Sequence, residues 1–180
     1  MVKLNDIENL KEAFEEAMKN YKYQEELTKR LDRHEGDFTE MTMLEIVLWK
    51  TNRYPKLAEG VIEDINDLRK EYTEVKARNL LRKLLSDDSK GFDLPMASTV
   101  LRFAVPDHLQ IIDQRVYRFI TTHDHLKTPY NVEKKIELYF DYIRTLRQKC
   151  DETGVSFNVS DRVFYLLDKQ QNKDFKLKTS

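Results

Sequence analysis

One aspartate, Asp113, lies between two apolar stretches of the chain, in a setting where a carboxylate can do chemistry. A carboxylate at the start of a helix accepts hydrogen bonds from the free amides of the first turn. In an apolar surround, the same group can stabilise a cation that develops on a bound ligand. Asp113 is therefore predicted to be a helix cap, a catalytic acid, or both. The flanking apolar residues are Leu109, Ile111 and Ile112 before it and Val116, Phe119 and Ile120 after it.

Two arginines follow Asp113 on the same predicted helix. Arg115 and Arg118 could contact phosphate; alternatively, they form buried ion pairs or lie on a solvated face. No metal is expected, because the chain has a single cysteine, Cys150, and because His123 and His125 lack further ligands at a recognisable spacing. No glycine-rich phosphate loop is present either, so we expect no cofactor.

Helices must position these residues. Apolar residues recur at three- and four-residue steps through nearly the whole chain, and no stretch shows the alternation of apolar and polar residues that is typical of a strand. Four glycines and four prolines leave few places for sharp turns. The prediction is an all-α fold of about eight helices. The N-terminal helical region, to about Leu31, has apolar steps at Leu4, Ile7, Leu10 and Phe14, and Asn20 and Tyr21 could interrupt it. Further helices are predicted over 39–51, from Pro55, from Thr73 or Glu74, over 94–104 and 113–122, from Val132, and over 160–170.

Composition limits the class of protein. The 180 residues suit one domain over 1–180, with an acidic N-terminal helical region over 1–33. Hydrophobic residues make up 40% and charged residues 35%, which argues against a membrane protein and against global disorder. The lone cysteine and the absence of an apolar leader predict a cytoplasmic protein. A net charge of −1 gives no nucleic-acid signal for the chain as a whole.

Residues 91–119 resemble the helix–hairpin–helix DNA glycosylase superfamily, the group that includes endonuclease III. The stretch 94–101, Leu-Pro-Met-Ala-Ser-Thr-Val-Leu, looks like the helix that follows the family's hairpin. The stretch 111–118, Ile-Ile-Asp-Gln-Arg-Val-Tyr-Arg, looks like the segment that carries its catalytic aspartate. The resemblance extends over a glycosylase-like core of residues 38–150. It implies the family's all-helical fold and an enzyme of base excision repair.

Carried over by position, Asp113 becomes the acid that stabilises the oxocarbenium character of the sugar as the base leaves. Bifunctional members carry a lysine nucleophile where this chain has Pro95, so the resemblance implies a monofunctional hydrolase. Leu44, Val47 and Leu48 would be the core face of the family helix that precedes the residue wedged into DNA, and Trp49 is predicted to be core. The implied DNA contacts are Lys50, Asn52, Arg53, Lys90, Gly91, Arg115 and Arg118.

The chain also departs from the family pattern. The family hairpin has two closely spaced glycines, whereas here Gly91 stands alone with Asp93 near the second position. An acid there would repel phosphate. One alternative function is therefore a non-catalytic helical module that binds nucleic acid or protein on a glycosylase-like scaffold. Another is a structural partner in a larger complex, with the acidic N-terminal helices as its docking surface. The sequence predicts neither the base nor DNA over RNA.

Overall fold

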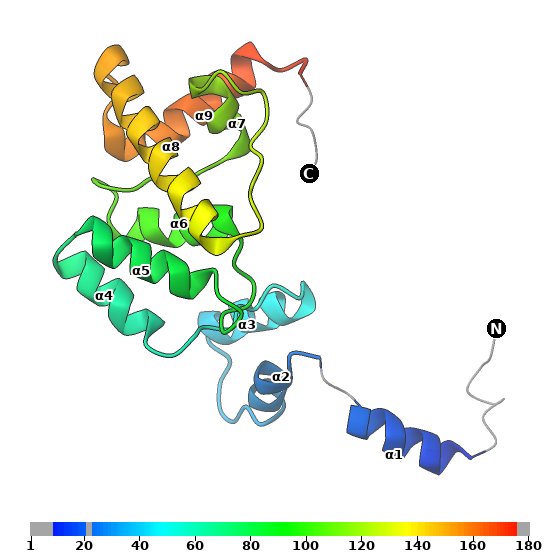
Figure 1. The fold of residues 1–180 in the computed structure, drawn as a ribbon. Helices are drawn as coiled ribbons and strands as arrows, with labels where there is room; N and C mark the ends of the chain where they lie inside the picture. Colours follow the sequence, from blue (N-terminus) through cyan, green and yellow to red (C-terminus); the bar gives the residue numbers. More distant parts are fainter. Residues whose placement is uncertain (1–8, 21–22, 176–180) are drawn as a thin grey trace. The chain divides into compact units, whose positions relative to one another are not determined.

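The computed structural model describes residues 9–20 and 23–175, which form nine α-helices (Figure 1). No β-strand occurs in this described part, so the prediction of an all-α fold is confirmed there. Leu4 and Ile7 of the predicted N-terminal pattern lie outside the described residues. The helices are α1 (Leu10–Asn20), α2 (Glu25–Asp32), α3 (Glu40–Lys50), α4 (Val61–Lys70), α5 (Glu74–Leu84), α6 (Leu94–Ala104), α7 (Gln114–Ile120), α8 (Val132–Thr153) and α9 (Ser160–Gln171).

The chain divides into two compact units, residues 1–54 and 55–180. The division falls inside the predicted core of residues 38–150, and a single domain over 1–180 stays a prediction. None of the helices in the described ranges is long and apolar enough to cross a bilayer.

In the first unit, α3 packs against α2 through Trp49. The Trp49 ring meets the edge of Tyr23 at a centroid distance of 5.2 Å, and its Nε1 donates to Thr28 Oγ1 at 2.8 Å. Trp49 is half-buried and packs within this unit, but it is not one of the fully buried residues. Leu44 and Val47 are half exposed, so their prediction as the core face is wrong. Apolar residues occupy all sides of α3, and α2 covers the side that carries Trp49.

In the second unit, α8 holds two groups of helices together. It packs on α5, which lies with α4 and α6, and it also contacts α7 and the short 3-10 helix Phe157–Val159 (Figure 1). α7 and α9 pack against each other. The centre of the core consists of side chains with no exposed surface, among them Leu81, Leu94, Leu101, Leu109, Ile112, Ile136 and Leu146.

The ends of these helices follow local rules where the sequence has caps. Thr73 caps α5 by accepting from the Lys76 amide at 3.2 Å, as predicted. The prediction that Pro55 starts a helix is wrong, because α4 begins at Val61. The chain at Lys56 forms an isolated antiparallel bridge instead: Lys56 exchanges two backbone hydrogen bonds with Lys90, at 3.0 and 2.8 Å. Gly60, with φ of 75°, then turns the chain into α4.

Truncation of a core side chain tests this packing. Leu101→Ala should lower the free energy of unfolding by about 2–5 kcal/mol, because Leu101 is fully enclosed and its removal leaves a cavity. Val75→Ala, at a position 68% exposed on α5, should change it by less than about 0.5 kcal/mol. Urea unfolding followed by circular dichroism measures both; equal effects would contradict the described core.

Candidate functional site

Asp113 is the N-cap of α7, as the sequence predicts. Its Oδ1 accepts from the amides of Arg115 at 2.7 Å and of Val116 at 3.4 Å. Within the described part of the chain, no hydrogen bond reaches Oδ2. The side chain is half-buried, so one oxygen fixes the orientation of the carboxylate and the other is left for a ligand.

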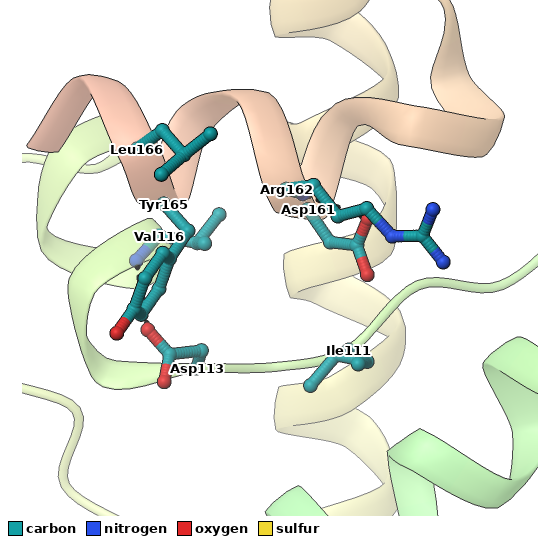
Figure 2. Close-up of a pocket in the computed structure, with 7 residues that line it drawn as sticks. All are labelled: Ile111, Asp113, Val116, Asp161, Arg162, Tyr165 and Leu166. Carbon is teal, nitrogen blue, oxygen red and sulfur yellow. Dashed lines mark hydrogen bonds between the residues drawn. The ribbon is translucent and has the colours of Figure 1, made fainter.

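Asp113 lines a pocket of about 400 Å³ between the start of α7 and α9 (Figure 2). The walls are mainly apolar, and three of the lining side chains are ionisable: two carboxyl groups and one guanidinium group. An apolar hollow with a few polar groups is the usual form of a small-molecule site. The lining residues are Ile111, Asp113, Val116, Asp161, Arg162, Tyr165 and Leu166.

Hydrogen bonds from α6 and α8 hold the segment that leads into Asp113. Tyr139 donates to the Gln110 carbonyl at 3.0 Å, and Tyr142 donates to the Ile111 carbonyl at 2.8 Å. Ser98 Oγ of α6 accepts from the Ile112 amide at 3.1 Å. Burial raises the pKa of both tyrosines well above the ordinary value, so the two phenols remain neutral donors. The wall that carries Asp113 is therefore fixed by its backbone.

The opposite wall, α9, is tied to α7 through Asp168. Asp168 is fully buried and receives two hydrogen bonds from Arg118, from Nε at 2.7 Å and from Nη2 at 2.8 Å. Arg115 adds a third at 3.2 Å, and Asn172 of the same helix end adds another at 2.8 Å. Of the roles predicted for Arg115 and Arg118, the structure contains the buried ion pair. Both guanidinium groups are thereby committed to Asp168.

Two opposing effects set the pKa of Asp168. Burial alone would raise it, but hydrogen bonds from Arg118, Asn172 and Arg115 outweigh burial and bring the pKa below its ordinary value. The hydrogen bond with Asp168 likewise raises the pKa of Arg118. The network is therefore ionised at neutral pH and holds the two walls of the pocket together.

The hairpin between α5 and α6 brings Lys90 and Gly91 next to Lys56. Gly91 has φ of 86°, and a Cβ there would lie 3.3 Å from Pro55 Cα, so both conformation and space require glycine. Lys56 and Lys90 are a directly opposed antiparallel pair, which places their exposed side chains on one face. Asp93 caps α6 by accepting from the Met96 amide at 2.9 Å, which accounts for an acid at this hairpin.

The remaining predicted DNA contacts belong to the first unit. Lys50 ends α3, and Arg53 lies exposed beyond it. Asn52 has φ of 53°, and its Oδ1 accepts from Gln24 at 3.0 Å. These three residues lie within residues 1–54, whereas Asp113, Lys90, Gly91, Arg115 and Arg118 lie in the second unit.

The α9 wall has no counterpart among the predicted site residues. The sequence indicates only a helix over 160–170, whereas the structure places Asp161 inside the first turn of α9, buried and lining the pocket. Tyr165 and Leu166 follow four and five residues later, a spacing that also describes an ordinary amphipathic helix. No sequence signal distinguished these residues, because only the packing of α9 on α7 brings them to Asp113.

Comparisons with models of known protein families, with curated proteins and with solved structures found no match. Among the described residues, no group of three or more histidine, cysteine, aspartate or glutamate side chains could hold a metal ion. The functional interpretation therefore rests on the pocket and its own side chains.

The Asp168 network predicts an acid-sensitive wall. Asp168→Asn should lower the free energy of unfolding at pH 7 by about 3–5 kcal/mol, because two arginines lose their shared carboxylate. A depressed folded pKa gives stability that is present above the unfolded pKa and lost as pH falls through the folded one. The difference between wild type and variant should thus shrink below about pH 4. Denaturant unfolding at stepped pH measures it; a difference constant with pH would contradict the ionised network.

Proposed function

We propose that the chain is a monofunctional DNA glycosylase that removes a damaged or modified base, with Asp113 as its catalytic acid. The observation that carries the proposal is the Asp113 carboxylate, which lines an apolar pocket while Oδ1 is held by two amides. The resemblance over residues 91–119 supports the same assignment for this aspartate.

The chemistry is hydrolysis of the N-glycosidic bond. The bond between C1′ and the base nitrogen breaks, and its electron pair leaves with the base. Positive charge grows on the sugar, and a fixed carboxylate in apolar surroundings stabilises it without reorienting. Water adds to C1′ and gives up a proton, the departed base takes up a proton on the nitrogen that held the sugar, and the products are the neutral base and the abasic sugar. Lyase chemistry is not part of the proposal, because Pro95, the second residue of α6, has no amine to form a Schiff base.

Access to the pocket requires the base to leave the duplex. Base extrusion costs least at damaged or mismatched pairs, which favours such substrates. The pocket volume of about 400 Å³ lies within the range that small-molecule sites occupy.

The proposed DNA contact of the second unit is the face that carries Lys56 and Lys90. Like charges directly opposed across a bridge repel each other, and a phosphate placed between them removes that repulsion. Lys56 joins Lys90 and Gly91 in this contact through backbone hydrogen bonds. Lys50, Asn52 and Arg53 stay predicted contacts of the first unit.

Asparagine in place of Asp113 tests the catalytic role while it keeps a good helix cap. Asp113→Asn should slow base release by about 10²–10³-fold and leave duplex affinity unchanged, because only the developing charge loses its partner. Single-turnover assays with excess protein, on duplexes with uracil, hypoxanthine, alkylated or oxidised bases, measure the abasic product.

Asp93→Asn is the matched control, since Asp93 also caps a helix and lies outside the pocket. Its release rate should equal that of the wild type. Equal rates for wild type and Asp113→Asn would rule out the proposed mechanism. Duplex binding without any base release would favour the alternative, a non-catalytic nucleic-acid-binding module.

Salt dependence tests the two lysines. Lys56→Gln and Lys90→Gln should each weaken binding to any duplex and reduce the slope of log affinity against log salt by about 0.9, the value for one phosphate contact. Lys70→Gln is the control, because Lys70 is paired with Asp67 at 3.5 Å on α4. Fluorescence anisotropy over a range of salt concentrations gives the slopes; unchanged slopes in both variants would remove this face from the DNA contact.

A further inference from the structure

We propose that Asp161 selects the base, by accepting a hydrogen bond from a ring N–H of a neutral nucleobase bound in the pocket. This inference rests on the proposed function and assigns its substrate class: bases that present a ring N–H, such as uracil and hypoxanthine, over bases that lack one. The observation behind it is a second carboxylate in the pocket, which the chemistry assigned to Asp113 does not use.

Asp161 is 5% exposed and lies in the first turn of α9, on the wall opposite Asp113. Figure 2 shows the two carboxylates coming from different elements around one space. A buried carboxylate in apolar surroundings is costly unless it is paired and hydrogen-bonded. The hydrogen bonds and charges that the protein already provides to Asp161 therefore determine which hydrogen bonds a ligand can add.

The partners of Asp161 balance its charge but do not use all of its hydrogen-bond acceptor sites. One Asp161 oxygen accepts from the Arg162 amide at 2.8 Å, and Oδ2 lies 3.6 Å from Arg102 Nε, too far for a hydrogen bond. Arg102 is itself buried and donates from Nη2 to the Asn158 carbonyl at 3.2 Å. An ionised carboxylate has about four acceptor sites. Lone pairs thus remain for a ligand that enters the pocket.

The same geometry defines the ligand. Arg102 neutralises Asp161, so the pocket does not need a cationic base to balance this carboxylate. An acceptor-only group rewards an N–H donor and repels a carbonyl or an unprotonated ring nitrogen at the same place. Sites built to hydrogen-bond a ligand group reject analogues that lack it far more strongly than apolar walls reject a change of size. Asp161 therefore acts on selection, and Asp113 on bond cleavage.

The test compares two bases that carry a methyl group at N9, where DNA carries the sugar, and that differ only at N1. In 9-methylhypoxanthine N1–H is the only ring N–H, and 1,9-dimethylhypoxanthine has none. Calorimetric titration of the whole chain should show about tenfold or greater preference for 9-methylhypoxanthine in the wild type, the size expected of a hydrogen bond to a charged group. Asp161→Asn should lose most of this preference, and the control Asp107→Asn, at an exposed position outside the pocket, should keep it.

A second variant places the bases in this pocket even if Asp161→Asn fails to fold. Leu166→Trp fills the pocket from a half-exposed position and should abolish binding of both bases. Equal binding of the two bases by the wild type, no binding of 9-methylhypoxanthine up to its solubility, or an unchanged preference in folded Asp161→Asn would each overturn the inference.

The experiments can distinguish a failure of the proposed glycosylase activity from a failure of base selection by Asp161. A preference that depends on Asp161, together with no abasic product on any duplex, would leave this inference standing and remove the glycosylase activity. Abasic product that depends on Asp113, together with a preference that ignores Asp161, would do the reverse.

Discussion

The pocket exists because one buried carboxylate joins two helices that are far apart in the sequence. α7 has only seven residues, and α9 begins forty residues after it ends. Asp168 of α9 takes a two-pronged hydrogen bond from Arg118 and a further one from Arg115, both on α7. Burying a carboxylate is unfavourable unless such partners surround it. The orientation of α9, and with it the wall that carries Asp161 and Tyr165, therefore depends on this ion pair.

The other wall depends on backbone hydrogen bonds. The segment before Asp113 is extended and would leave its carbonyl groups unpaired, but tyrosines of α8 donate to two of them. Asp113 in turn accepts from α7, so a single residue connects the anchored segment to the helix. Orientation of the acid before any ligand arrives is what electrostatic stabilisation of a transient cation requires.

Local sequence patterns predicted most helices and several of their caps. They did not predict which distant side chains pair with each other. The bounds of α6 and the caps at Thr73 and Asp113 follow from residues within one turn of each other, so the sequence sufficed. The helix predicted from Pro55 was wrong because the fixed φ of proline suits an extended segment as well as a first helical turn. The next residue, Lys56, forms its backbone hydrogen bonds with Lys90, which is distant in the chain. The core face of α3 was predicted wrongly because apolar residues lie on all sides of this helix. Asp161 and Asp168 could not be assigned, since their meaning comes only from residues on other helices.

The two walls of the pocket differ in how they respond to acid. The phenols of Tyr139 and Tyr142 carry no charge at low or neutral pH, so protons do not loosen the segment that holds Asp113. The α9 wall is joined by a carboxylate that protons neutralise. Acidification therefore loosens the tie between α9 and α7, while the tyrosine hydrogen bonds that anchor the segment before Asp113 persist. The molecule can in this way release one wall of its pocket while the backbone of the other wall keeps its anchors.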